Sequence, residues 1–286
     1  MVQRLYQAVH GFFLQDQYDK DLHIKSSSIS LPSRFGLLDG SAERWTTFRL
    51  AISQLNANAP ENTSYKVIFF GRHGEGYHNV AEAKYGTQAW DDYWSKLNGD
   101  GELVWGPDPD LTPLGVDQAI AARELWKAEL PFGIPLPEKL YCSPLTRAIR
   151  TNILTFEGVI TDDTRKTTIV ENCREENGVH TCDKRRSRSF IKSTYPQLLL
   201  EEGFTEEDEL WDANARETKT ELDARARTVL DNVFEDGEKQ FISITAHGGF
   251  IGAILRVTNH WSYRLATGGY IPIVIKGTNL TTDSMP

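Results

Sequence analysis

The sequence has few cysteines and no long hydrophobic run. Its 286 residues contain only three cysteines, an odd number without paired spacing: Cys142, Cys173 and Cys182. A disulfide framework is therefore not expected, and a reducing compartment fits better. No stretch reaches the roughly 18 apolar residues of a membrane span, and the first residues lack the apolar core of a signal peptide. We expect a cytoplasmic or nuclear protein without a membrane partner.

Positive charge is in the minority. Lys and Arg number 31 against 40 Asp and Glu, which gives a formal net charge of −9. This balance argues against a general nucleic-acid surface, so no nucleic-acid partner is expected. It does not exclude a small anionic ligand held by a local arginine cluster. The composition leaves homo-oligomerisation open.

Several motifs for cofactor and metal chemistry are absent. The chain has no P-loop, no GxGxxG unit followed by an acidic residue, no HExxH and no GxSxG. Their absence counts against nucleotide-cofactor chemistry and against a serine hydrolase. Two pairs could suggest a metal, His73 with His78 and His180 with Cys182, but neither has the ligand set of a structural zinc site. We therefore expect no cofactor and no metal.

What the chain does contain is a repeated order of strand, polar turn and helix. Predicted strands at residues 65–70, 140–142 and 241–245 are each followed by a predicted helix. This order indicates a layered α/β fold with a central, mostly parallel sheet flanked by helices. We expect residues 1–286 to form a single domain. An N-terminal extension, residues 1–60, would pack on a catalytic core at residues 65–275.

Arginine and histidine side chains follow directly after these predicted strands. They are Arg72-His73, Arg147 and His247. In open α/β sheets the ligand lies beyond the carboxyl ends of the strands, so these residues are expected to converge there. Arginine offers a planar fork of donors suited to phosphate, and histidine can attack phosphorus or move a proton at neutral pH. The pattern therefore indicates phosphoryl chemistry.

These residues belong to a larger set of motifs that resembles the histidine phosphatase superfamily, whose members have the phosphoglycerate-mutase-like fold. The similar segments are Arg72-His73-Gly74, Leu111-Thr112-x-x-Gly115-x-x-Gln118-Ala119, Ser143-Pro144-Leu145-x-Arg147-Ala148, Arg174-Glu175 and Ala246-His247-Gly248-Gly249. The resemblance covers residues 65–275 and implies a three-layer sandwich. Residues 76–79 and 178–185 look most like the fungal and plant phosphomutase-like branch.

The resemblance implies a role for each central residue. His73 would be the nucleophile that forms a phosphohistidine, while Arg72, Arg147 and His247 would hold the phosphoryl oxygens. A carboxylic acid must give the leaving alkoxide its proton. The resemblance prefers Glu175 for this step, whereas the residue chemistry alone leaves Glu176 as an equal alternative.

Further residues near these motifs are expected to bind the substrate. They are Tyr77, His78, Asn79, His180, Arg185 and Gly248. Asn79 would hydrogen-bond phosphate or fix its own loop, and Arg185 would extend the site toward a second anionic group. The aromatic residues of the segment 86–109 are expected to pack among themselves.

The function implied is a metal-independent phosphomonoesterase acting on a small phosphorylated metabolite. Two alternatives remain: a phosphoglycerate or sugar-phosphate mutase, and a non-catalytic protein that binds a phospho-ligand. Between Glu75 and Asn79 the mutases of the family favour serine followed by tryptophan, whereas this chain has Gly76, Tyr77 and His78. This departure favours the phosphatase.

Overall fold

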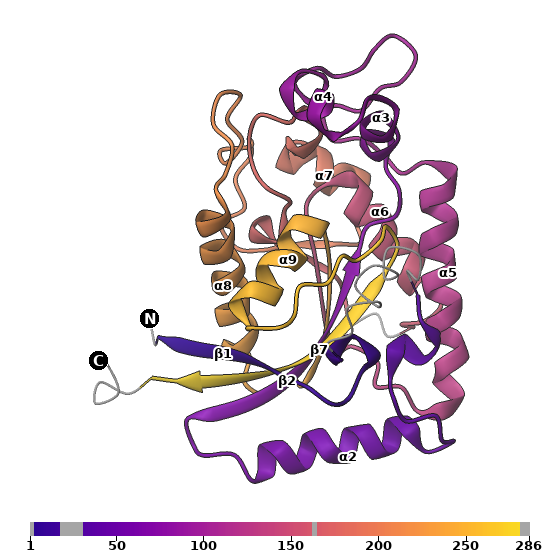
Figure 1. The fold of residues 1–286 in the computed structure, drawn as a ribbon, viewed down its shortest axis with the longest axis vertical. Helices are drawn as coiled ribbons and strands as arrows, with labels where there is room; N and C mark the ends of the chain where they lie inside the picture. The colour runs from indigo at the N-terminus through magenta and orange to yellow at the C-terminus, as the bar shows by residue number, and fades with distance from the viewer. Residues whose placement is uncertain (1–2, 18–30, 162–164, 281–286) are drawn as a thin grey trace.

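The computed structural model describes residues 3–17, 31–161 and 165–280, which form a central sheet with helices on both faces (Figure 1). The strands are β1 (Arg4–Val9), β2 (Thr63–Arg72), β3 (Lys139–Cys142), β4 (Thr168–Ile169), β5 (Leu199–Leu200), β6 (Phe241–Ala246) and β7 (Tyr270–Asn279). The α-helices are α2 (Arg44–Ala57), α3 (Tyr77–Tyr85), α4 (Thr87–Asp92), α5 (Pro113–Glu129), α6 (Thr146–Phe156), α7 (Arg188–Thr194), α8 (Lys219–Glu235) and α9 (Gly248–Val257). Within these ranges, no helix is both long and apolar enough to cross a membrane.

The sheet has the strand order β1-β7-β2-β6-β3-β4-β5. Strands β2, β6, β3, β4 and β5 pair in parallel, whereas β7 runs antiparallel to both β2 and β1. The predicted mostly parallel sheet is therefore confirmed. Strand β4 is only two residues long, because Glu171 already begins the 3-10 helix η5 (Glu171–Cys173).

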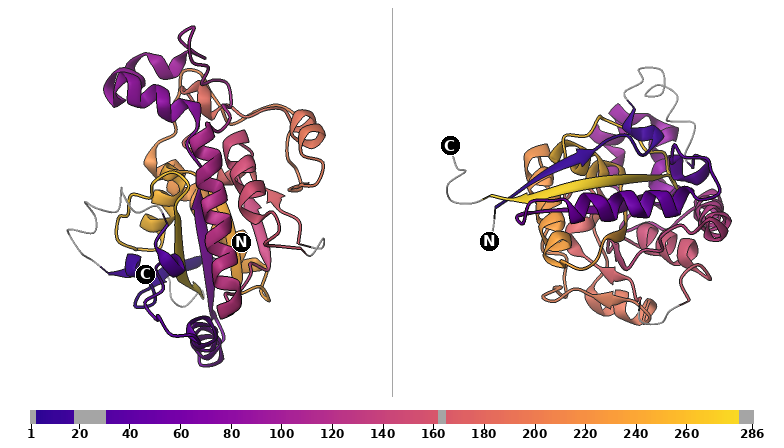
Figure 2. Two further views of the ribbon diagram at one scale, coloured as in Figure 1. Left: turned by 90° about the vertical axis from the view of Figure 1, so that its right-hand side faces the viewer. Right: turned by 90° about the horizontal axis from the view of Figure 1, so that it is seen from below.

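Successive side chains of a strand point to opposite faces of the sheet, so the central strands contribute to two separate cores. On β2, Ile68 and Phe70 join the core beneath α8 and α9, while Val67 and Phe69 join the core beneath α2 and α5. All four are fully buried. The three layers are helices, sheet and helices, and they show most clearly in the two rotated views (Figure 2).

The N-terminal extension is part of the sheet rather than only a cover on its outside. Strand β1 pairs with β7 at the sheet edge, and Phe13 and Phe35 are fully buried in the core beside α2. Our expectation that the extension packs on a finished core is therefore corrected in this respect. Apolar residues from the described part of the first 40 positions contribute to both cores.

The segment after α3 projects from the end of the molecule toward which β2 runs (Figure 1). Its aromatic residues pack against one another, as predicted: Trp90 and Trp105 contact edge to face. Trp94 also stacks on Tyr85, the last residue of α3, with ring centroids 3.9 Å apart. This small cluster lies directly above the carboxyl edge of the parallel strands.

Candidate active site

The turn after β2 lies beside the turn after β6. The two strands are parallel, and Arg72 pairs with Ala246 at their last residues. The backbone N–H of His73 then donates to the carbonyl of Ala246 at 3.0 Å. The rings of His73 and His247 are consequently 5.0 Å apart between centroids. The structure thus brings these two predicted residues together at one sheet edge.

A close backbone approach explains the glycines of the first two motifs. A Cβ added at Gly74 would overlap the carbonyl of Gly115, and one at Gly115 would overlap the backbone of Glu75. Thr112 caps α5 by accepting from the Gly115 N–H at 3.1 Å, and its hydroxyl donates to the Glu75 carboxylate at 2.8 Å. The N-terminus of α5 is thereby fixed against the histidine turn.

His73 is held as a neutral imidazole with a defined tautomer. Its Nδ1 lies 2.6 Å from the carbonyl oxygen of Gly74. Since a carbonyl only accepts, Nδ1 carries the proton and Nε2 keeps its lone pair. Burial, followed by the charges of Arg147 and Arg72, lowers the pKa of His73 well below its usual range. The ring therefore offers an unprotonated nitrogen at neutral pH.

Two further histidines beside His73 are neutral for the same reason. His78 and His247 are buried, and burial is the main cause that lowers the pKa of each well below its ordinary value, with Arg147 the next cause. The fixed positive charge of the site therefore comes from arginine. The histidines contribute hydrogen-bonding nitrogens rather than charge before a ligand binds.

Four buried nitrogens around His73 have no hydrogen-bond partner among the residues that the structure describes. They are Arg72 Nε, Arg147 Nε, His78 Nδ1 and His247 Nδ1. Leaving a buried polar group unpaired costs about 1–3 kcal/mol, more for a charged one. Natural folds rarely carry several such groups in one place. Their clustering indicates a site that is completed by an anionic ligand.

Both arginines of this set are anchored through their terminal nitrogens. Arg72 Nη1 donates to the carbonyl of Leu265 at 2.7 Å. Arg147 donates from Nη1 to the carbonyl of Cys182 at 2.7 Å and from Nη2 to the Asp183 carboxylate at 2.8 Å. Each guanidinium is thus fixed in place while its Nε–H stays without a partner, so the site is organised before any ligand arrives.

These groups open into a cavity of about 210 Å³. Its walls are formed by Arg72, His73, His78, Asn79, Glu82, Trp90, Asp91, Arg147, Glu175, Glu176, His180, Cys182, Asp183, Arg216 and Gly249. Most of the predicted site residues are in this wall. His247 is not among these wall residues, although its ring lies beside that of His73.

The two candidate proton donors have different neighbours. Glu175 accepts from the backbone N–H of Gly249, in the first turn of α9, at 3.0 Å, and a Cβ at Gly249 would overlap its carboxylate. Glu176 lies 3.5 Å from Arg216 Nε, and burial raises its pKa. Arg225 Nη2 donates to the backbone carbonyl of Glu175 at 2.9 Å, which ties the segment to α8.

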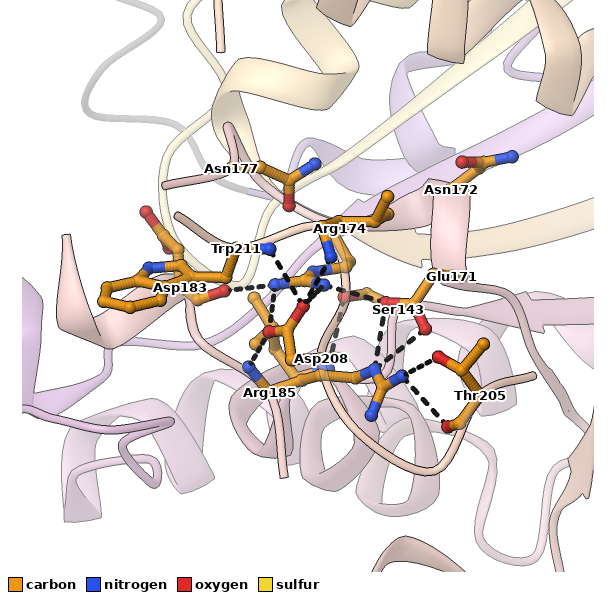
Figure 3. Close-up of polar contacts among 12 residues, drawn as sticks. Ser143, Glu171, Asn172, Arg174, Asn177, Asp183, Arg185, Thr205, Asp208 and Trp211 are labelled. Carbon is orange, nitrogen blue, oxygen red and sulfur yellow. Dashed lines mark hydrogen bonds and ion pairs between the residues drawn. The ribbon is translucent and has the colours of Figure 1, made fainter. Parts of the chain in front are cut away.

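Arg185 does not reach the cavity, which corrects our prediction that it binds substrate. Its Nε donates to Glu171 at 2.8 Å, and its terminal nitrogens donate to Thr205 and to neighbouring carbonyls (Figure 3). Next to it, Arg174 forms a bidentate pair with Asp208 at 2.6 and 2.7 Å. All three nitrogens of Arg185 are engaged, so the residue braces the loop instead of binding a ligand.

Three other predicted residues have supporting positions. Tyr77 does not line the cavity, and its backbone N–H donates to Asp110 at 3.3 Å. Asn79 does line it, but its side-chain oxygen accepts from the Gly76 N–H at 3.0 Å and so fixes the loop. Gly248 begins α9 beside the Arg72 guanidinium, while its neighbour Gly249 forms part of the wall.

Arg216 is a cavity residue that the sequence did not reveal. It donates to Asp183 at 2.9 Å and to the carbonyl of Gly178 at 2.7 Å. Asp183 therefore bridges Arg147 and Arg216. Burial alone would raise the pKa of the Asp183 carboxyl, but the two arginines lower it below its ordinary value. Arg216 lies in an irregular stretch without a motif, so no local pattern could have identified it.

His180, Cys182 and Asp183 lie close enough together to suggest a metal site. The carboxylate of Asp183 is already paired with two arginines, and burial raises the pKa of the Cys182 thiol well above its usual range. A metal ion would have to displace the arginines and deprotonate a buried thiol. The surroundings of this group suit an anion better than a cation.

The sequence was compared with known proteins. A family model described as histidine phosphatase superfamily (branch 1) matches residues 68–267. The chain is 43% identical to the probable phosphoglycerate mutase of Arthroderma benhamiae, over 95% of this chain and 84% of that protein. It is 34% identical to phosphomutase-like protein 3 of Candida albicans, over 97% and 82%. It is 36% identical to the probable phosphoglycerate mutase of Saccharomyces cerevisiae, over 78% and 82%.

Proposed function

Since the chain belongs to the histidine phosphatase superfamily and resembles its fungal phosphomutase-like members, we propose that it is a phosphomonoesterase acting through a phosphohistidine. Its substrate would be a small phosphorylated metabolite. The observation that carries the proposal is the set of partnerless buried nitrogens around the neutral imidazole of His73. A phosphoryl group is an anion with enough oxygens to satisfy all of them.

In the first half-reaction, Nε2 of His73 attacks phosphorus and the ester P–O bond breaks. Arg72 and Arg147 donate from Nε to the phosphoryl oxygens, whose charge is greatest in the transition state. The Ser143 hydroxyl lies 2.7 Å from Nε2 of His247. With that hydroxyl as donor, His247 Nδ1 carries a proton and becomes a third hydrogen-bond donor to the phosphoryl group.

The leaving alkoxide takes a proton from a carboxylic acid in the cavity wall. We assign this role to Glu175, because it contacts the first turn of α9 beside the phosphoryl site. In the second half-reaction the same carboxylate removes a proton from water, which attacks the phosphohistidine. Orthophosphate leaves and His73 returns to its neutral form. The positive charge for both steps comes from arginine, so the proposed chemistry requires no metal.

A phosphomutase is the second candidate, and the names of the curated relatives favour it. It would share the first half-reaction and differ in the second, where a substrate hydroxyl instead of water accepts the phosphoryl group. Product analysis separates the two. A phosphatase releases orthophosphate, and a mutase returns an isomer of its substrate.

The test is phosphate release from a panel of phosphomonoesters in excess chelator, with the wild type compared with His73→Ala. We expect chelator-resistant release that falls by about 10⁴-fold or more in the variant, because loss of a nucleophile removes the whole covalent route. Orthophosphate should still raise the melting temperature of His73→Ala, since the arginines remain. Unchanged release by His73→Ala, or no ester hydrolysed at all, would contradict the proposal.

A further inference from the structure

Three side chains with metal-binding atoms converge at the C-terminal end of α9, outside the cavity described above. His10 follows β1, Asp16 ends the 3-10 helix η1 (Leu14–Asp16), and His260 follows α9. Oδ1 of Asp16 lies 3.5 Å from Nε2 of His260 and 4.0 Å from Nδ1 of His10. We propose that these three residues form a binding site for one zinc ion.

The carboxylate of Asp16 is oriented by its backbone surroundings. Its Oδ2 accepts three backbone N–H groups, from Gly11 at 3.1 Å, Phe12 at 2.9 Å and Phe13 at 2.8 Å. Its Oδ1 is buried and has no hydrogen-bond partner. One oxygen thus fixes the group and the other is left for a ligand, which is the arrangement of a monodentate carboxylate supported by a second shell.

His260 is oriented in the same way. Its Nδ1 lies 2.8 Å from the carbonyl oxygen of Trp261 and carries a proton, because a carbonyl only accepts, so Nε2 is the nitrogen left for a ligand. That Nε2 is buried, has no hydrogen-bond partner and faces Asp16. A nitrogen and an oxygen without hydrogen-bond partners therefore face each other in a buried place, and a cation between them would satisfy both.

The backbone holds these segments together without help from the three side chains. The N–H of Ala8 donates to the carbonyl of Thr258 at 2.7 Å, which joins β1 to the end of α9. Asn259 has a φ of 53°, and the His260 N–H returns to the carbonyl of Leu255 at 2.8 Å. This left-handed turn closes the helix and sets the position of the imidazole. The site is therefore preformed.

Zinc suits this set of ligands better than a proton does. Neutral imidazole nitrogen and carboxylate oxygen are zinc ligands with bonds of about 2.0–2.2 Å, so tetrahedral ligand atoms lie about 3.4 Å apart. The separation of 3.5 Å between Asp16 and His260 is close to this value, whereas His10, at 4.0 Å from Asp16, must move inward. A proton shared by Asp16 and His260 would leave His10 unused. The His10 side chain is 35% exposed, which provides a path for the ion.

The proposed ion would stabilise the fold and not take part in phosphoryl transfer. His247 caps the N-terminus of α9, whereas His260 lies beyond its C-terminus, and a helix of 10 residues is about 15 Å long. The ion would tie the N-terminal extension to the end of this helix. Loss of zinc should consequently lower thermal stability, because the ion binds only the folded arrangement.

The experiment is a zinc titration of the full chain after removal of metal with a chelator, by calorimetry and thermal unfolding with zinc chloride as the probe. The wild type should bind one ion per chain, and excess zinc should raise its melting temperature by on the order of 5 °C. His10→Ala should bind at least tenfold more weakly. This residue is partly exposed, so the variant is expected to fold.

His180→Ala is the matched control, since it removes a histidine from the other possible metal group. It should bind zinc like the wild type, and His260→Gln should behave like His10→Ala. The proposal is overturned if the wild type binds no stoichiometric zinc, if His10→Ala binds it equally well, or if His180→Ala abolishes binding. A melting temperature that excess zinc does not change would also overturn it, because an ion that binds only the folded chain must stabilise it.

Discussion

Arg72 is partly buried at the end of β2, and Arg185 is buried in a loop near the same edge of the sheet, but the surroundings of the two arginines are opposite. Arg185 donates from every guanidinium nitrogen to protein oxygens, including the carboxylate of Glu171. Arg72 has one anchoring hydrogen bond and a buried Nε without a partner. Among the described residues, no carboxylate forms an ion pair with Arg72 at all. The protein supplies all the hydrogen-bond partners of Arg185, whereas Arg72 keeps a donor for a ligand.

This contrast distinguishes a structural arginine from one that binds an anion. A buried charge is stable only if it is paired, and removing its partner typically costs 3–5 kcal/mol. Arg185 obtains its partners within the chain, so it contributes to stability. Arg72 is held in place but lacks a full set of partners, so it can donate a hydrogen bond to a phosphoryl group. This interaction is strongest in the transition state, where negative charge develops on the phosphoryl oxygens.

The largest effect is expected for Arg72→Ala. It should lower kcat/KM for phosphomonoesters by about 10³- to 10⁵-fold, because an arginine on a transferring phosphoryl group contributes on this scale. Its free energy of unfolding should change little. Arg72→Lys is the control that keeps the charge and loses the fork, and it should recover only part of the activity. A fully active Arg72→Ala variant would remove the distinction between the two arginines.

Arg185→Met should have the reverse effect. We expect a loss of about 3–5 kcal/mol in the free energy of unfolding, because Glu171 loses one of its cationic partners and several carbonyls lose their donors. Urea denaturation measures this change. Arg186→Ala, at the exposed neighbour, should stay within about 0.5 kcal/mol of the wild type. Folded Arg185→Met at saturating substrate should keep most of its kcat; a specific loss of kcat would show that Arg185 serves the substrate after all.

The two neighbouring glutamates provide a finer test. Glu175→Gln should reduce kcat about 10²- to 10⁴-fold for an alkyl phosphate, which needs a proton on its leaving group, and much less for p-nitrophenyl phosphate, which does not. Glu176→Gln should show a smaller loss without dependence on the leaving group. The ratio of the two substrates, measured for both variants, assigns the donor. The opposite pattern would transfer the role to Glu176.

The sequence predicted what depends on local pattern. The apolar run before Arg72-His73 and the glycines after it indicated a buried strand ending in a functional turn, and the structure has β2 followed by that turn. Thr112 and Pro113 are residue types that capping chemistry favours at a helix start, and α5 does begin there. Both features need only neighbouring residues, because they depend on backbone propensity and capping.

What the sequence missed depends on contacts between distant segments. Arg185 and Arg72 are the same residue type in polar turns, and only the structure shows that one meets Glu171 and Thr205 while the other faces a cavity. The group at the end of α9 unites His10 with His260, from opposite ends of the chain, through the pairing of β1 and β7. A spacing rule for metal ligands cannot detect such a pair.

The smallest effect concerns the neutral histidines that surround the arginines. Burial lowers the pKa of His78, so between that lowered pKa and about 6.5 the unfolded chain binds a proton that the folded chain does not. The free energy of unfolding must then fall with falling pH, by about 1.4 kcal/mol per pH unit for each such histidine. Asp108, whose pKa is raised to about 6, works in the opposite direction below pH 6.

Asp108 contributes equally to the free energy of unfolding of the wild type and of His78→Asn. The difference between the two free energies therefore reports on His78 alone. Urea denaturation at several pH values between 5 and 7 should therefore show a shallower decline for the variant, by about 1.4 kcal/mol per pH unit below pH 6.5. Parallel curves would mean that His78 has the same pKa in the folded and the unfolded protein, so that it is protonated in the folded protein below about pH 6.5. The positive charge around His73 would then come from histidine as well as from arginine. The site would differ from the surroundings of Arg185 in its number of cations, and not in whether its arginines have protein partners.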